Sequence, residues 1–223
     1  MRDSDISRLE TKFCGFKLRN PFLVASGPPS RDFNMIKRAF ETGWAGAVTK
    51  TITLIPTKDV SPRLQILNYG HSTVNLELIS SVSPKLWVKW IADLKKKYPR
   101  QMLIASIMGL PNPVTWKKLA QLMEEAGADA LELNISCPHG LPEKGMGALI
   151  GQDPVRAAEV TQWVKWAVKI PVVVKLTPNV TDITAIASAC VKAGADAISG
   201  INTVKSLGGI DLNKLEPLPS VNG

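Results

Sequence analysis

The stretch EAGADALELNISCP, residues 125–138, contains the signals that decide the fold. Gly127 follows an amphipathic segment, and an alternating run from Ala130 to Ser136 comes directly after it. Glycine tolerates the left-handed conformation that closes many helices, and alternating apolar and polar residues are typical of a strand. The stretch therefore predicts a helix that ends, a tight turn, and a strand that Pro138 terminates.

The same punctuation recurs along the chain. ETGWAGA at 41–47, EAGADA at 125–130 and KAGADA at 192–197 each separate an amphipathic segment from a β-rich run. Strands are therefore predicted, with helices between them, at residues 22–26, 46–51, 102–108, 130–136, 171–177 and 197–203. This alternation indicates an α/β fold with a parallel sheet covered by helices, either open or closed as a barrel. The chain reads SGPPSRD after the first strand, without the glycine-rich turn of a dinucleotide-binding sheet, which favours a TIM (β/α)8-type barrel.

The spacing of apolar residues supports the helices. Asp153-Pro154 has the cap residue and the first-turn proline that begin many helices. Three helical stripes are predicted. The first has Leu86, Trp90, Ile91 and Leu94, the second has Ala157, Val160, Trp163, Val164 and Ala167, and the third has Ile183, Ile186, Ala187 and Cys190. Cys190 is therefore interpreted as a core residue.

Composition narrows the class of protein. The chain has 223 residues, of which 45% are hydrophobic, which suffices for one buried domain. We expect a soluble, cytoplasmic protein, because no apolar run reaches the roughly 18 residues of a membrane helix and residues 1–13 lack the apolar core of a signal peptide. The three cysteines have no C-x-x-C spacing and predict neither disulfides nor a metal site. The net charge of +8 is read mainly as solvated helix faces, with phosphate ligands or RNA as the alternative.

Polar side chains gather where the predicted strands end. In a β/α barrel, the carboxyl ends of the strands form the rim that bears the binding and catalytic residues. These ends carry Ser26, Lys50, Ser106, Asn134, Ser136, Cys137, Lys175, Thr177, Asn202 and Thr203. Alternation places Leu131, Leu133 and Ile135 on one face of their strand and Glu132, Asn134 and Ser136 on the other. If the apolar face packs on the helices, the polar face points into the barrel.

The residue types at this rim predict a chemistry. Lysines beside a flat, electron-accepting ring can stabilise the negative charge that builds on reduction, and asparagine amides match an edge that alternates C=O and N–H. Cys137 can hold a proton at neutral pH and donate it as a general acid; the alternative is a small buried hydrophobic residue. The glycine-rich loop 137–152 could move as an active-site lid.

Several stretches resemble the dihydropyrimidine dehydrogenase family, whose members contain a flavin-dependent barrel that reduces pyrimidines. These are LELNISCPHG, EKGMG, GQDP and VKLTPNVTDI, together with NPFLVAS, VTKTITL, SPR, VNLELIS and INTVKS. They span nearly the whole chain in the same order. INTVKS, IDLN and VNG are most similar to the FMN-bearing subunit of the bacterial NAD-dependent members.

The resemblance implies an oxidoreductase in which FMN passes hydride to C6 of uracil or thymine and Cys137 protonates C5. The implied substrate-binding residues are Asn75, Glu77, Asn134, Ser136, Asn202 and Thr203. The implied cofactor-binding residues are Ser26, Lys50 and Lys175, with Asn134 and Asn202 shared. The resemblance also implies a homo- or hetero-oligomer with a partner subunit that carries FAD and iron–sulfur clusters and oxidises NAD(P)H. It implies no metal ligands in this chain and neither membrane nor nucleic-acid partners.

Other readings remain open. Cysteine-type dihydroorotate dehydrogenases also resemble LNISCP, but VNLELIS stands where their substrate motif is expected. The tRNA-dihydrouridine synthases are flavin barrels with an analogous Cys-Pro, and the basic charge would suit RNA. The long 52–80 segment, predicted to be an insertion after the second strand, and the GMG loop do not fit them.

The length of the chain predicts an incomplete barrel. An eight-fold barrel takes about 250 residues, whereas this chain supplies about six of the eight βα units in one domain, 1–223. In the family the seventh and eighth strands provide the glycine-rich turns and helix N-terminus for the FMN phosphate. A non-catalytic, truncated remnant unable to hold FMN is therefore the alternative to an enzyme.

Overall fold

A parallel sheet organises the chain. The computed structural model describes residues 9–58, 64–66, 73–137 and 145–217. Parts of the predicted insertion (59–63 and 67–72) and of the predicted active-site loop (138–144) lie outside the described residues, as do both ends of the predicted domain 1–223. None of the described helices is long and apolar enough to cross a membrane.

The sheet has six parallel strands, and all six predicted strands are confirmed. They are β3 (Leu23–Val24), β4 (Gly46–Val48), β7 (Met102–Ile107), β8 (Ala130–Asn134), β9 (Val172–Lys175) and β10 (Ala197–Ser199). Their spatial order, β10-β9-β8-β7-β4-β3, follows the order of the chain. Several strands are shorter than predicted, because the polar residues at their carboxyl ends leave the hydrogen-bonded ladder and form loops.

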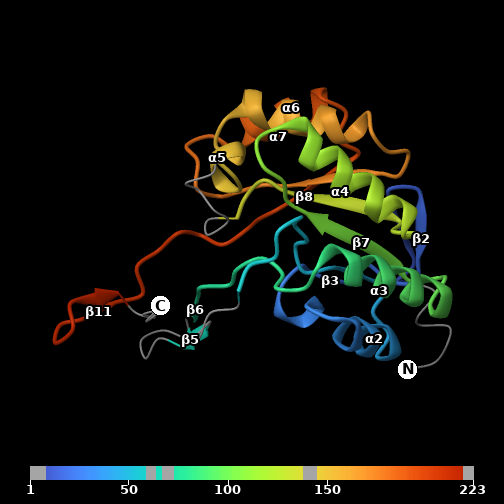
Figure 1. Ribbon diagram of the computed structural model, residues 1–223, viewed down its shortest axis with the longest axis horizontal. Helices are drawn as coiled ribbons and strands as arrows, with labels where there is room; N and C mark the ends of the chain where they lie inside the picture. Colours follow the sequence, from blue (N-terminus) through green and yellow to red (C-terminus); the bar gives the residue numbers. More distant parts are fainter. Residues whose placement is uncertain (1–8, 59–63, 67–72, 138–144, 218–223) are drawn as a thin grey trace.

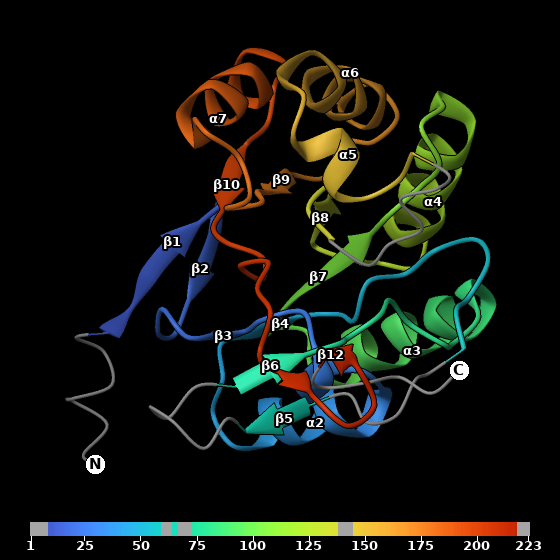
Figure 2. The same ribbon diagram turned by 90° about the vertical axis from the view of Figure 1, so that its left-hand side faces the viewer.

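Helices cover the outer side of the sheet. They are α2 (Phe33–Glu41), α3 (Pro84–Lys97), α4 (Pro113–Glu125), α6 (Pro154–Lys165) and α7 (Ile183–Lys192). Figure 2 shows the sheet curving, with these helices following one another around its convex side. Two short helices, the 3-10 helix η2 (Pro28–Ser30) and α5 (Ala148–Gly151), lie in loops after strands. The fold is a partial α/β barrel of the TIM type, as the sequence predicted.

The signals in the sequence account for the helix ends. Gly43, Gly127 and Gly194 have φ values of 101°, 95° and 100°, which confirms the predicted left-handed turns after the helices. At the amino ends, Asp, Ser or Asn side chains accept hydrogen bonds from backbone N–H groups in the first turn; they are Asp32, Ser83, Asn112, Asp153 and Asp182.

The GADA repeat has a structural role at the amino ends of the strands. Asp129 accepts hydrogen bonds from the Leu103 backbone N–H and from Lys95 Nζ, both at 2.7 Å. Asp196 does the same with the Val172 backbone N–H at 2.7 Å and with Lys165 Nζ at 2.5 Å. Each aspartate therefore joins a helix to the start of the neighbouring strand.

The first of the three repeats has no aspartate, and a glycine follows the position where the aspartate would stand. Ala45 takes the place of Asp129 and Asp196, two residues after the turn glycine, and Gly46 comes next. A Cβ atom there would lie 2.5 Å from the Met102 carbonyl oxygen and 2.7 Å from a Leu23 methyl carbon. Only glycine fits this close approach between β4 and its neighbours.

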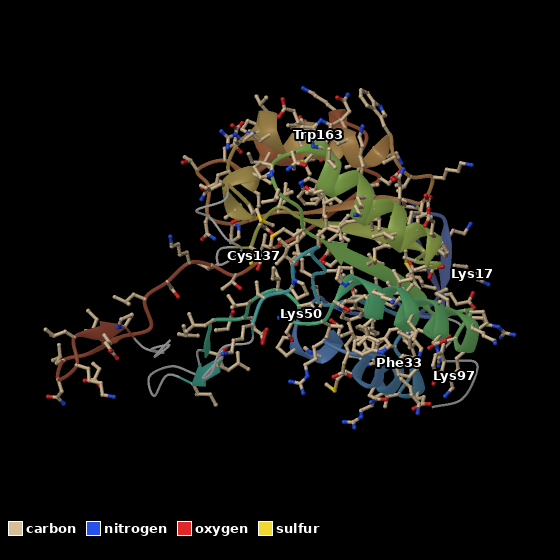
Figure 3. All side chains as sticks on the ribbon, in the orientation of Figure 1. Lys17, Phe33, Lys50, Lys97, Cys137 and Trp163 are labelled. Carbon is tan, nitrogen blue, oxygen red and sulfur yellow. The ribbon has the colours of Figure 1, made fainter. Side chains whose placement is uncertain are left out.

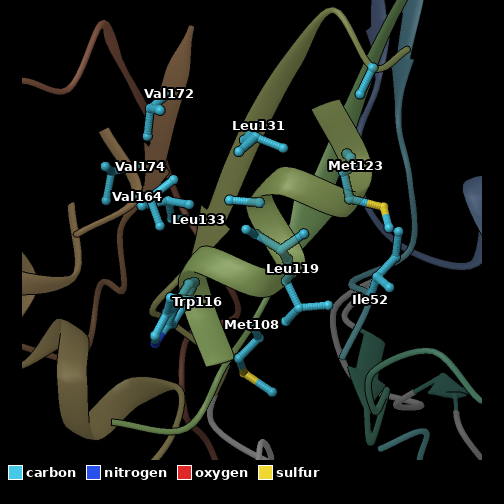
Figure 4. Close-up of a cluster of buried hydrophobic side chains, with 14 of the residues drawn as sticks. Ile52, Met108, Trp116, Leu119, Met123, Leu131, Leu133, Val164, Val172 and Val174 are labelled. Atoms are coloured by element: carbon cyan, nitrogen blue, oxygen red, sulfur yellow. The ribbon is translucent and has the colours of Figure 1, made fainter. Parts of the chain in front are cut away.

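The main core lies between the sheet and the helices. Figure 4 shows Leu131 and Leu133 of β8 facing Trp116 and Leu119 of α4, and all four side chains are 0% exposed. Cys190 is buried in this core, as predicted. The predicted stripe on α3 is confirmed at Ile91 and Leu94, both 0% exposed, but was wrong at Leu86, which is 39% exposed while its neighbour Trp87 is fully buried.

A second, smaller core fills the barrel interior near the amino ends of the strands. Its buried residues are Leu18, Ala45, Val48, Met102, Ile104 and Ala130. The antiparallel hairpin of β1 (Thr11–Phe13) and β2 (Phe16–Leu18) packs against it. The interior is therefore apolar at its amino end, which leaves the polar residues of the inward face to the carboxyl end.

Two further hairpins lie beyond the carboxyl end of the sheet. They are formed by β5 (Leu64–Ile66) with β6 (Thr73–Asn75), and by β11 (Ile210–Asp211) with β12 (Glu216–Pro217). Figure 1 shows the segment after β10 extending away from the sheet to β11. Leu212 and Leu215 on this segment are 81% and 80% exposed.

Candidate active site

A pocket at the carboxyl ends of the strands brings the predicted residues together. Its lining includes Ser26, Lys50, Asn75, Glu77, Asn134, Cys137, Lys175, Asn202 and Thr203. Figure 3 shows Cys137 and Lys50 at the end of the sheet toward which β7 points. These residues lie between positions 26 and 203. They come from five of the six strand ends of the sheet, from β6 and from the segment that follows β6, so the fold alone makes them neighbours.

Thr51 is the centre of a hydrogen-bond network beneath the pocket. Asn134 Nδ2 donates to Thr51 Oγ1 at 2.8 Å. The same hydroxyl lies 3.0 Å from Ser106 Oγ and 3.5 Å from Ser26 Oγ. The network links the ends of β3, β4, β7 and β8 and orients the Asn134 amide. Sequence reasoning missed Thr51, although its position directly after Lys50 at a strand end was a usable signal.

Asn134 and Asn202 are joined through Ser136. The Asn134 Oδ1 atom accepts hydrogen bonds from the Ser136 N–H at 3.2 Å and from its hydroxyl at 3.1 Å. Asn202 Nδ2 donates to Ser136 Oγ at 2.9 Å and to Asn134 Oδ1 at 3.4 Å. Ser136 itself is fully buried and is not among the residues that line the pocket. The structure thus places it behind the two asparagines.

Lys50 and Glu77 form an ion pair within the pocket. Their side chains are only 9% and 14% exposed. The segment that bears Glu77 is attached to the end of β4, because the Ser80 N–H donates to the Thr51 carbonyl oxygen at 2.9 Å. On the other side of the segment, Asn75 Nδ2 donates to Thr203 Oγ1 at 3.5 Å. This segment therefore crosses the mouth of the half-barrel from β4 to the residues after β10.

Cys137 stands at the point where the chain leaves β8. Its side chain lines the pocket although the residue is only 7% exposed. The chain returns to it at Gly147: the Ala148 N–H donates to the Cys137 carbonyl oxygen at 3.0 Å, and a Cβ on Gly147 would overlap that oxygen. Gly147 also has a φ of 60°, so both the close contact and the backbone conformation favour glycine at this position.

Asn179 supports the far side of the pocket and was also missed. Its Nδ2 donates to the Thr203 carbonyl oxygen at 3.0 Å, and its Oδ1 accepts from the Lys205 N–H at 2.8 Å. The side chain thereby attaches the residues after β10 to the loop after β9. Its partners lie 24 and 26 positions away, so only its place in the TPN motif after a strand could have suggested it.

The donor set fits a flat, electron-accepting heterocycle such as a flavin. Two lysines and two asparagines offer ammonium and amide groups to the carbonyl and N–H edge of such a ring. The network through Thr51 and Ser136 fixes both amides before any ligand arrives. Among the described residues, no group of three or more His, Cys, Asp or Glu side chains is placed to hold a metal ion.

The fold and the pocket define a β/α-barrel protein whose binding site lies at the carboxyl ends of its parallel strands. A model of the dihydroorotate dehydrogenase family matches residues 8–221, and the chain belongs to this family. This family includes the flavin barrels that the sequence motifs resembled.

Two kinds of relatives are similar over nearly the whole chain. The chain is 42% identical over 94% of its length to the chloroplastic dihydropyrimidine dehydrogenase (NADP(+)) of Arabidopsis thaliana. It is 40% identical over 96% of its length to the NAD-dependent dihydropyrimidine dehydrogenase subunit PreA of Escherichia coli. It is 38% identical over 95% of its length to the catalytic subunit of dihydroorotate dehydrogenase B (NAD(+)) of Pyrococcus abyssi.

The chain is shorter than these relatives. It spans 52% and 53% of the two dihydropyrimidine dehydrogenase sequences, and 68% of the Pyrococcus subunit. Among solved structures, ligand-free dihydroorotate dehydrogenase from Eimeria tenella superimposes with a TM-score of 0.76 over 92% of this chain and 64% of that one. At 16% sequence identity this likeness establishes the barrel fold alone.

Proposed function

We propose that the chain is the FMN-binding barrel domain of a flavin-dependent oxidoreductase that reduces the C5=C6 bond of uracil or thymine. The observation that carries the proposal is the single pocket in which Lys50, Lys175, Asn134, Asn202 and Cys137 meet. Identities of 40–42% to proteins named dihydropyrimidine dehydrogenase support it. Residues 137–152 would form the active-site loop.

The polar edge of the flavin ring would be held by Lys50, Lys175, Asn134 and Asn202, with Ser26 also in contact with the flavin. When bound, FMN supplies the hydride that reaches C6 of the pyrimidine. Lys175 places positive charge in the pocket, which favours a ring edge that becomes negative on reduction, while Lys50 would contact the ring as the ammonium group of its ion pair with Glu77. Asn134 and Asn202 are prepositioned by hydrogen bonds, so orienting them on binding requires little loss of side-chain entropy.

The remaining polar residues would hold the pyrimidine. Uracil and thymine alternate C=O and N–H groups along one edge, which the side chains of Asn75, Asn202 and Thr203 can match as donors and acceptors. Ser136 would act from behind, through the two asparagines. The Cys137 thiol would donate its proton to C5, the carbon beside the one that receives the hydride.

Glu77 separates this proposal from its nearest competitor. The similarity to dihydroorotate dehydrogenase B subunits makes dihydroorotate the alternative substrate. Dihydroorotate and orotate carry a carboxylate, and Glu77 puts a second carboxylate into the same pocket, where its charge is already matched by Lys50. Because Lys50 is already paired with Glu77, it is not available to pair with a substrate carboxylate, so a neutral pyrimidine suits this pocket better.

A partner would deliver the electrons. The similar Escherichia coli protein is named as a subunit of an NAD-dependent enzyme. We therefore propose that NAD(P)H is oxidised by a separate subunit that carries FAD and iron–sulfur clusters.

The test separates the two half-reactions in the purified chain reconstituted with FMN. We expect Cys137→Ser to leave chemical reduction of the flavin unchanged and to slow its reoxidation by uracil or thymine by about 10²- to 10⁴-fold, because a hydroxyl is a far weaker acid than a thiol. Stopped-flow absorbance under anaerobic conditions measures both steps.

Cys14→Ser is the matched control, because Cys14 lies in the turn between β1 and β2 and does not line the pocket. It should behave like the unsubstituted chain. A chain that folds but binds no FMN would contradict the proposal, and it would support the alternative of a non-catalytic remnant. Reoxidation by orotate but not by uracil or thymine would favour the dihydroorotate dehydrogenase reading.

A further inference from the structure

A buried carboxyl group lies below the pocket and takes no part in the chemistry proposed so far. Glu132 is on the inward face of β8, two residues before Asn134, and is 5% exposed. In the sheet it is level with Ser106 of β7 and Val173 of β9. It therefore occupies the layer between the apolar interior and the polar rim.

Only one of the two carboxyl oxygens of Glu132 has a hydrogen-bond partner among the described residues. Ser199 Oγ donates to its Oε2 at 3.1 Å, while its Oε1 is buried and has no hydrogen-bond partner among the described residues. A buried carboxylate normally has each oxygen paired, because an unpaired one loses its hydration without replacement. The arrangement suits a carboxyl group that changes its charge rather than one that is always ionised.

Lys175 is the charged group that acts on Glu132. Burial raises the pKa of Glu132, and the positive charge of Lys175 partly opposes this rise. The residues level with Glu132 on the two flanking strands, Ser106 of β7 and Val173 of β9, are neutral, and so is Ser199 of β10, which donates to it. Lys175 is next to Asn134 and to Ser199 in the register of the sheet, and its side chain lines the pocket. The charge of Lys175 therefore acts both on Glu132 and on any ligand in the pocket.

We propose that Glu132 is a positioning residue that sets how much positive charge Lys175 presents to a ligand in the pocket. When Glu132 is neutral, the ammonium charge acts on the ligand without compensation. When Glu132 gives its proton to solvent, its negative charge offsets part of that of Lys175. This inference depends on the proposed function, because the ligand whose charge changes is the flavin.

The experiment measures the two-electron reduction potential of bound FMN from about pH 5 to about pH 9. At the alkaline end we expect Glu132→Gln to favour reduced FMN about tenfold more than the unsubstituted chain, about 30 mV for a two-electron couple. As the pH falls the two potentials should approach each other, because the Glu132 carboxyl group takes up a proton and becomes neutral like the glutamine amide. In a Lys175→Met background the Glu132→Gln effect should become smaller.

Glu159→Gln is the matched control, since it removes the same charge from an exposed position on α6. It should leave the potential unchanged. Equal potentials for Glu132→Gln and the unsubstituted chain at every pH, with FMN bound and pyrimidine reduced, would overturn the inference and leave the proposed function intact. Absence of FMN binding to the folded chain would overturn both.

Discussion

Strands β8 and β10 share one sheet but differ in their surroundings. Every residue of β8 is buried, because β7 and β9 flank it and α4 covers its outer face. Among the described strands β10 has only β9 beside it, and its residues are half-buried or, at Ile198, 36% exposed. Beyond β10 the chain carries large apolar side chains in solvent, Leu212 among them. An apolar side chain therefore contributes more to the free energy of unfolding on β8 than on β10 or the segment after it.

The candidate site depends on both regions. Asn134 and Cys137 come from the buried strand, while Asn202 and Thr203 follow the exposed one. Hydrogen bonds from Asn202 to Ser136 and from Asn179 to Thr203 connect the two. The buried side is held by packing on both faces, whereas the residues after β10 are attached mainly by hydrogen bonds such as these.

The largest expected effect tests the packing difference directly. Leu119→Ala should lower the free energy of unfolding by about 3 kcal/mol, because the fully buried side chain leaves a cavity between α4 and β8. Leu212→Ala, the same substitution on the exposed segment, should change it by less than about 0.5 kcal/mol. Urea unfolding measures both. A comparable loss in the two variants would mean that the segment after β10 is packed in solution.

The paired aspartates give a smaller and more specific contrast. Asp129→Asn should destabilise the fold by about 2 kcal/mol, because it removes a charged acceptor shared by Lys95 and the Leu103 N–H, with side chains 13–17% exposed. Asp196→Asn should cost about half as much, because its pair with Lys165 is 31–34% exposed and more screened by water. Raising the salt concentration should reduce the second effect more than the first. Equal effects in both variants would contradict the difference in burial.

Regular periodicity explains what could be predicted. The strands, the glycine turns and the polar rim follow from alternation and local capping, which act over a few residues. The hairpins were not predicted, because strands of two or three residues are too short to show a periodic pattern of apolar residues. The first position of the stripe on α3 was wrong because Leu86 and Trp87 are both apolar, and packing alone decides which of them turns inward.

The supporting residues of the site were harder to predict. Lys50 and Glu77 were assigned to different ligands, and nothing in their spacing of 27 positions shows that they pair. Thr51 meets Asn134 across 83 positions. Such contacts depend on strand register and on the path of a loop, which are properties of the assembled barrel. Residue type alone could place groups at the rim, but it could not say which of them hold the others.

Asn179→Ala gives the smallest expected effect and tests how the exposed side is held. It removes two hydrogen bonds that attach residues 203–205, so FMN affinity should fall about fivefold, equivalent to about 1 kcal/mol. The free energy of unfolding should change by less than about 0.5 kcal/mol, because no residue of the sheet loses a contact. Hydrogen exchange of the Lys205 N–H, which loses its acceptor, should become faster even without FMN.

Asn213→Ala is the control, because Asn213 lies in the turn between β11 and β12, outside the pocket lining. It should alter neither FMN affinity nor the exchange of the Lys205 N–H. If Asn179→Ala left that exchange unchanged, the segment would be held by other contacts, and the exposed side would be more independent of β9 than its hydrogen bonds indicate. If Asn179→Ala also abolished folding, the stability of the buried strand β8 would depend on the residues after β10, and the contrast between the two regions would be wrong.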